Sequence, residues 1–166
     1  MTPRVRQATL TVHVVLSVGW LGSVAAFLAL SIAGLTSADA QIMRGAYLSM
    51  DLIGRYVIVP LSLASTASGI FQALASPWGL FKHYWVAVKF LLTVLSTLLL
   101  LLHQFTAVAT AAERVSRAAP GTLPREEVGP LGTQLVFDAG LALLVLVAIT
   151  VLSIFKPWGR TPYGRE

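Results

Sequence analysis

The chain has 166 residues, of which 56% are hydrophobic and only 11% are charged, and its formal net charge is +5. Ordinary soluble domains contain roughly 45–50% apolar and about 25% charged residues, so this composition excludes a disordered protein and argues against a soluble enzyme. It predicts a polytopic membrane protein. Cysteine is absent, which excludes disulfides, thiolate metal sites, thiol catalysis and covalent haem attachment through a C-x-x-C-H motif.

Four apolar runs follow one another along the chain, and each exceeds the roughly 20 residues that a helix needs to cross the hydrocarbon core. They cover residues 8–34, 52–75, 80–109 and 134–155. The first run is longer than the apolar part of a signal peptide, which has roughly 7–15 residues, so we interpret it as a retained span. Pro60 lies within the second run and predicts a kink in that helix.

The connecting segments differ in polarity. Residues 35–51 are expected to form a moderately polar, partly helical loop, and residues 76–79 a tight turn. Residues 112–132 form the one long hydrophilic loop, and the tail 156–166 is basic and rich in turn formers. We therefore expect a single integral membrane domain, 1–166, with an all-α fold: a transmembrane four-helix bundle.

The distribution of Lys and Arg predicts the orientation, because the cytoplasmic ends of spans retain basic residues. With both termini inside, seven basic residues lie inside and five outside. We therefore expect an N-in, C-in, multi-pass protein of the bacterial cytoplasmic membrane, surrounded by lipid. The same reasoning assigns the basic excess to membrane topology rather than to nucleic-acid binding, since no basic and aromatic patch falls on a soluble segment.

A short motif occurs twice and suggests an internal repeat. Pro77-Trp78-Gly79 follows the second apolar run, and Pro157-Trp158-Gly159 follows the fourth. The segments that begin at His13 and His83 also correspond, each with a histidine, a small residue, a valine and an aromatic residue. The pattern predicts two related helical hairpins that start on the same side of the membrane, a parallel repeat.

The two histidines also suggest a cofactor site. Because a helix advances about 100° per residue, each histidine shares a helical face with the small and aromatic residues that follow it. For His13 these are Ser17, Trp20, Val24, Phe27 and Ser31, and for His83 they are Ala87, Phe90, Val94 and Thr97. Two imidazoles from facing helices are what bis-His ligation of a b-type haem requires.

In such a site each neighbouring side chain has a role. Ser17 and Ala87 are small enough to leave room for the porphyrin edge, and Trp20 and Phe90 would wall it. The haem propionates would meet basic side chains from Arg6, Lys82 or Lys89. The most specific hypothesis is therefore a cytochrome-like module with haem b between the first and third spans, which exchanges electrons with quinone or a membrane partner subunit. Another metal at the same histidines, or purely structural histidines, are the alternatives.

A second group of ionisable residues lies toward the outer side. Asp51 and Arg55 are four residues apart and can pair, and His103 and Asp138 lie at comparable depth in the third and fourth spans. These four residues form a predicted outer polar cluster, because charges in the membrane are costly and pair with one another. The cluster could carry protons, bind a cation or clamp the bundle.

This cluster supports an alternative function, a cofactor-free accessory subunit or a small-solute or ion permease. Met43 and Met50 lie near the same side and leave copper transport as a third hypothesis. Small residues along the first span suggest close helix packing and allow a homodimer. No phosphate loop, HExxH, GxSxG, EF-hand or dinucleotide motif occurs, so hydrolytic or transferase activity is not expected.

Several segments resemble a known family. These are His13 with Gly19-Trp20-Leu21-Gly22, the stretch from Trp78 to Lys89, and the ending Lys156-Pro157-Trp158-Gly159. Over nearly the whole chain they look like an uncharacterised bacterial, actinobacterial-type family of four-span integral membrane proteins of unknown function. The chain is more distantly similar to copper-resistance D-like membrane proteins. That likeness implies copper handling or haem-type chemistry, although the chain lacks the Met- and His-rich stretches of a copper carrier.

Overall fold

The computed structural model describes residues 2–76, 79–119 and 125–164. These residues form helices and no strands, as expected for an all-α bundle. The first two long helical stretches are α1 (Pro3–Thr36) and a continuous run made of α2 (Ala40–Ile53), the π-helical segment η1 (Gly54–Ile58) and α3 (Val59–Ala75). They are followed by α4 (Tyr84–His103), η2 (Gln104–Val108), α5 (Ala109–Arg117), α6 (Arg125–Val128), α7 (Pro130–Phe155) and the 3₁₀ turn η3 (Pro162–Gly164).

Within the described residues, four helical stretches are long and apolar enough to cross a membrane. They run from Pro3 to Thr36, Ala40 to Ala75, Tyr84 to Arg117 and Pro130 to Phe155. This confirms the predicted number of spans and the four-helix bundle. The second span begins at Ala40, earlier than the predicted residue 52, because most of the predicted partly helical segment 35–51 belongs to α2. Asp39 caps that helix by accepting hydrogen bonds from the backbone N–H groups of Gln41 and Ile42.

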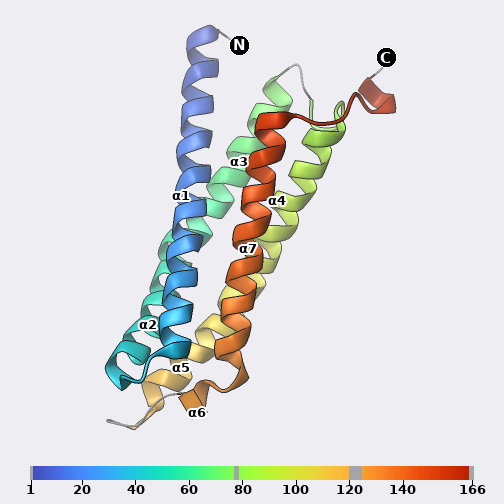
Figure 1. Ribbon diagram of the computed structural model, residues 1–166. Helices are drawn as coiled ribbons and strands as arrows, with labels where there is room; N and C mark the ends of the chain where they lie inside the picture. The colour runs from blue at the N-terminus through green and yellow to red at the C-terminus, as the bar shows by residue number, and fades with distance from the viewer. Residues whose placement is uncertain (1, 77–78, 120–124, 165–166) are drawn as a thin grey trace.

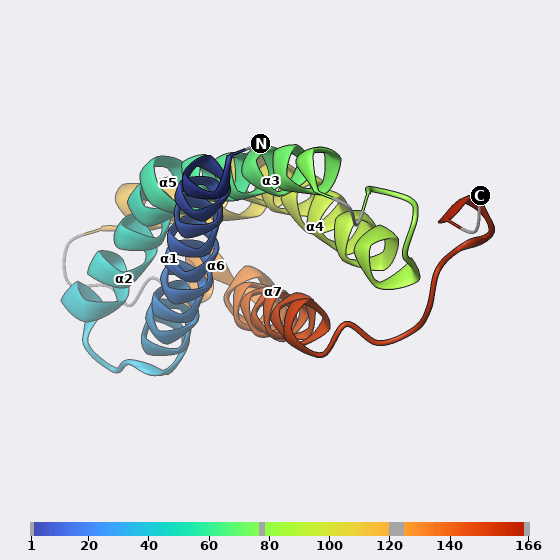
Figure 2. The same cartoon turned by 90° about the horizontal axis from the view of Figure 1, so that it is seen from above.

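The chain runs up and down, so both termini lie at one end of the bundle (Figure 1). We call this the terminal end; it also holds the connection from α3 to α4. The opposite loop end holds the α1–α2 connection, α5 and α6 (Figure 1). Helix α1 packs against α2, α3 and α7, whereas α4 packs against α3 and α7. Viewed from above, α1 and α4 therefore lie diagonally across the bundle (Figure 2).

The tightest packing lies at the loop end. There the fully buried apolar side chains come from α2, η2, α5, α6 and α7; they are Met43, Tyr47, Met50, Val108, Ala111, Val115, Val128 and Leu135. The first half of α1 is covered along one side only, toward α3, and its other valines and leucines are exposed. The loop end is therefore a packed core, and the terminal end presents most of its apolar surface to the surrounding membrane.

Two π-helical segments interrupt the second and third spans. In η1 the Val59 N–H donates to the carbonyl of Gly54, five residues back. Pro60 follows directly and has no N–H to offer, so the predicted irregularity takes the form of a widened turn before the proline. In η2 the Ala109 N–H similarly donates to the carbonyl of Gln104; no proline accompanies this segment.

The start of the third span differs from the sequence prediction. Its helix begins at Tyr84 and not near residue 80, and His83 is the residue before it, with an extended backbone. The tail explains the difference, because Thr161 donates from its N–H to the carbonyl of Lys82 and from its hydroxyl to the carbonyl of Phe81. The predicted turn at 76–79 and the first Pro-Trp-Gly motif include residues 77 and 78, and the predicted loop 112–132 includes 120–124; these residues lie outside the described ranges.

Replacing Met50 tests whether the loop end is the stable core. Met50 is 0% exposed, so Met50→Ala should lower the free energy of unfolding by about 2–5 kcal/mol through lost contacts and a residual cavity. The matched control is Leu144→Ala on α7, since Leu144 is 68% exposed and should change stability by less than about 1 kcal/mol. Thermal unfolding in detergent measures both, and equal losses would contradict this assignment.

Candidate functional site

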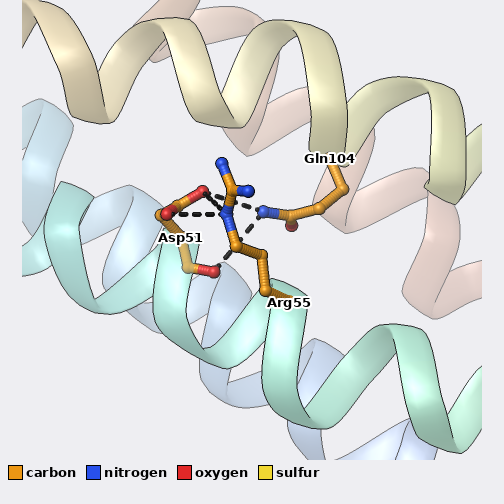
Figure 3. A network of polar contacts seen from close by, with 3 residues as sticks. All are labelled: Asp51, Arg55 and Gln104. Carbon is orange, nitrogen blue, oxygen red and sulfur yellow. Dashed lines mark hydrogen bonds and ion pairs between the residues drawn. The ribbon is translucent and has the colours of Figure 1, made fainter.

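The most extensively bonded charged group is Asp51, at the last turn of α2 (Figure 3). Arg55 Nε donates to both of its carboxylate oxygens, at 2.8 and 2.9 Å. Gln104, at the start of η2, donates from Nε2 to Asp51 Oδ1 at 3.1 Å and to the Asp51 backbone carbonyl at 3.4 Å. The carboxylate thus accepts hydrogen bonds from Arg55 in its own span and from Gln104 in the third span, so it links the second span to the third.

Gln104 can reach Asp51 because Gly54 lies beneath it. A Cβ atom at position 54 would overlap the Gln104 side-chain amide, so only glycine leaves space for this contact. Arg55 in turn lies over the Phe105 ring, with the guanidinium carbon 5.8 Å from the ring centre. The two π-helical segments therefore face each other. Gly54 of η1 lies against Gln104 of η2, and Arg55 of η1 lies over Phe105 of η2.

The second ionisable pair lies apart from the first. His103 Nε2 is 3.4 Å from Asp138 Oδ2 on α7. This separation is within ion-pair range, but the angles are not those of a hydrogen bond, and His103 Nε2 has no hydrogen-bond partner. His103 and Gln104 are adjacent, so their side chains leave the helix about 100° apart. The structure arranges the four residues of the predicted outer cluster as two pairs, Asp51 with Arg55 and His103 with Asp138. A joint role for the two pairs stays a prediction.

A row of polar contacts joins α1 to α3 through the spanning region. His13 Nδ1 lies 2.8 Å from the Ser68 hydroxyl, and the Ser17 and Ser65 hydroxyls also lie 2.8 Å apart. At the terminal end, Gln72 Nε2 donates to the Thr9 carbonyl at 2.8 Å. A fourth contact joins α3 to α4, between the Thr66 and Thr97 hydroxyls at 3.0 Å. We call these four contacts the polar seam.

His13 fits into the seam because α3 has a glycine opposite it. A Cβ atom at Gly69 would lie 3.2 Å from His13 Cε1, closer than is usual for side chains. The predicted face of α1 is confirmed: Trp20, Val24, Phe27 and Ser31 are all buried, and His13 and Ser17 bond to α3. This face is therefore occupied by α3 along the half that contains His13.

The structure places the other predicted haem-site residues separately. His83 precedes α4 at the terminal end, where it forms an isolated bridge with Arg160 of the tail. His83 is the N-cap residue of α4, with an extended backbone, and its carbonyl accepts the Ala87 N–H at 3.1 Å, so it lies at the end of the helix and not within it as predicted. Phe90 packs edge-to-face against Phe81, with ring centres 6.4 Å apart. Trp20 belongs to the main core. His13 bonds to α3, and His83 lies beside the tail.

Two further predicted groups have clear surroundings. The Lys89 ammonium lies over the Trp85 ring, 5.4 Å from its centre. Met43 and Met50 are fully buried in the loop-end core. Among the described residues, no three His, Asp or Glu side chains are close enough together to hold a metal ion.

Comparison with known proteins does not assign a family: no family model, curated protein or solved structure matches the chain. The resemblance described above therefore stays a prediction. Sequence analysis missed Gln104, which lies next to His103 within the third apolar run. Gln104 is an amide side chain within the apolar run 80–109. Its position could have indicated a polar contact between helices, because a buried amide needs hydrogen-bond partners.

Replacing Gln104 tests the Asp51 network. Gln104 is 1% exposed, and Gln104→Ala removes a donor from Asp51 and leaves a void, so we expect a loss of about 1–3 kcal/mol in the free energy of unfolding. Gln41→Ala, at an exposed position of α2, is the matched control and should be close to neutral. Thermal unfolding in detergent measures both, and an unchanged midpoint for Gln104→Ala would contradict the network's role.

Proposed function

We propose that the chain is a multi-pass protein of the bacterial cytoplasmic membrane, N-in and C-in, that conducts protons along the polar seam. The observation that carries the proposal is the contact between His13 and Ser68 inside a membrane-spanning segment. An ionisable residue at this depth is costly and marks a functional site by default. Imidazole is also the side chain whose ordinary pKa lies nearest to neutral pH, so it exchanges protons readily.

The rest of the seam supports the same function. Hydroxyl groups can donate and accept at once, and Ser68, Ser65 and Ser17 extend the His13 contact along the α1–α3 interface. The Thr66–Thr97 contact lies on the neighbouring face of α3, toward α4, because Thr66 follows Ser65 directly and its side chain leaves the helix about 100° away. Gln104 lies seven residues after Thr97, two helical turns or about 10 Å along the same face, and its amide bonds to Asp51.

On this account each end of the path has its own ionisable group. His13 accepts a proton near the terminal end, the hydroxyls and intervening water pass it along α3, and the Asp51 carboxylate receives it at the loop end. Arg55 keeps Asp51 paired between transfers. Two steps have no direct hydrogen bond among the described contacts, from the Ser17–Ser65 pair to the Thr66–Thr97 pair and from Thr97 to Gln104, so water must bridge both.

Proton flux into proteoliposomes tests this function. Vesicles that contain pyranine and a valinomycin-driven potassium potential should acidify faster with the protein than without it. His13→Gln and Ser68→Ala should each slow acidification by about tenfold, since a positioned proton-transfer group contributes at least this factor.

The matched control is Thr150→Ala on α7. Thr150 bonds only to a carbonyl of its own helix, so this variant removes a hydroxyl away from the seam and should retain the wild-type rate. Wild-type flux equal to that of empty vesicles would refute conduction and favour a cofactor-free accessory subunit. Equal slowing in all three variants would show that the seam has no special role.

Bis-His haem binding is the second candidate, and one contact favours it. Ser68 engages His13 through Nδ1, which leaves Nε2 for a metal, and outer hydrogen bonds of this kind commonly orient metal-binding histidines. The second ligand would be His83, which precedes α4 at the terminal end, and the electron partner would be quinone or another subunit. Reduced and oxidised absorption spectra test this function: sharp reduced α and β bands lost in His13→Ala would support it, and a flat spectrum with added hemin would refute it.

A further inference from the structure

The tail folds back onto the segment that leads into α4. Residues 156–164, which we call the tail latch, leave the end of α7 and bond to this segment through the backbone. The Thr161 N–H donates to the Lys82 carbonyl at 3.0 Å, and the Tyr84 N–H donates to the Gly159 carbonyl at 3.4 Å. The tail latch therefore ties the end of the fourth span to the start of the third.

The latch is packed closely as well as hydrogen-bonded. Thr161 is 7% exposed, and its hydroxyl donates to the Phe81 carbonyl at 2.6 Å. A Cβ atom at Gly164 would overlap the backbone carbonyl of Lys82, and a backbone group cannot rotate away as a side chain can. The closed position therefore depends on the Thr161 hydrogen bonds and on a glycine at position 164.

The backbone is strained where the latch begins. Lys156 has φ 46° and Trp158 has φ 68°, and positive φ is uncommon outside glycine and an outlier for a bulky residue. Lys156 also precedes Pro157, a position that favours an extended backbone. Gly159, which could adopt positive φ freely, does not do so. The strain at Lys156 and Trp158 therefore opposes the hydrogen bonds that hold the latch closed.

The latch meets α4 across an incompletely filled space. An open hollow of about 480 Å³ is lined by Tyr84 and Val88 of α4 and by Trp158 and Gly159 of the latch. Helix α4 packs against α3 and α7, and the ends of α4 and α7 that the latch joins both lie at the terminal end (Figure 1). The latch is therefore a link between these two helix ends in addition to their direct packing.

We propose that the tail latch opens and closes as a unit, and that its closure sets the separation of α4 and α7 at the terminal end. Strain at Lys156 and Trp158 favours opening, and the contacts of Thr161 and Gly164 favour closure. Strained backbone of this kind is typical of switch regions, where the surrounding contacts hold it in place. The proposal concerns the shape of the terminal end and does not depend on proton conduction.

Distance measurement by double electron–electron resonance in lipid tests the separation. Spin labels at Leu91→Cys on α4 and Ile154→Cys on α7 occupy exposed positions, and the chain has no other cysteine. We expect a narrow main distance in the labelled protein. Adding Gly164→Ala should move the main population to longer, broader distances, because the new methyl group cannot coexist with the Lys82 carbonyl.

The matched control is Gly159→Ala. It adds the same methyl group to the same segment, but at position 159 no atom lies within 4 Å of the added Cβ. The main distance should therefore stay as in the parent. If Gly164→Ala does not fold, Thr161→Val replaces it, since valine keeps the shape of threonine and removes only the hydroxyl that bonds to Phe81.

Hydrogen exchange of the Tyr84 amide tests the opening itself. Tyr84 is the first residue of α4, so its N–H has no partner within the helix and reports the bond to the latch. Thr161→Val should speed this exchange about fivefold, the factor that one hydrogen bond contributes. Thr150→Val, which removes a hydroxyl bonded within α7, should leave it unchanged. Trp158→Gly should slow the exchange because glycine relieves the strain.

Four results would overturn the proposal. Unchanged distances in Gly164→Ala would show that the latch does not set the separation of the helices. Equal shifts in Gly164→Ala and Gly159→Ala would assign the effect to any alanine in the tail. Tyr84 exchange as slow as that of the buried Met50 amide would mean that the latch opens only when the whole protein unfolds. Faster exchange in Trp158→Gly would show that Trp158 holds the latch closed instead of straining it.

Discussion

Inside a membrane, a polar side chain must find its partner within the protein, because lipid offers none. Helix α3 is rich in hydroxyl groups, and this constraint decides which helix it packs against. Ser68 and Ser65 pair with His13 and Ser17 of α1, and Gln72 pairs with the α1 backbone. Since apolar packing alone barely distinguishes a helix from lipid, these polar contacts set the alignment of α1 on α3.

The same constraint explains the loop end. Asp51 carries a charge that water reaches only in part, so it draws donors from two spans: Arg55 beside it and Gln104 across from it. Bringing Gln104 over Gly54 places the two π-helical segments face to face. Wide helical turns often occur at functional sites because they redirect a side chain out of the regular pattern. Here each of the two π-helical segments provides one donor to the Asp51 carboxylate, Arg55 from η1 and Gln104 from η2.

The sequence predicts much of this arrangement where helical periodicity governs it. The number of spans follows from the length of the apolar runs, and the buried face of α1 follows from the 100° advance between residues. The partner of that face does not follow, since Ser68 is 55 residues from His13 along the chain and periodicity carries no pairing information. His83 shows a second limit. Its position outside α4 depends on hydrogen bonds from Thr161 in the tail, which local sequence does not reveal. The split of the outer cluster is simpler, because adjacent helical residues such as His103 and Gln104 cannot face the same neighbour.

His13 and Ser68 form one hydrogen-bonded unit within the first and second spans. Nitrogen-15 NMR of the histidine side chains in lipid measures it most directly, because the two ring nitrogens report their own hydrogen bonds. We expect distinct Nδ1 and Nε2 signals for His13, with the Nδ1 signal shifted in Ser68→Ala and unchanged in Thr150→Ala. A His13 spectrum that Ser68→Ala leaves unaltered would contradict the account.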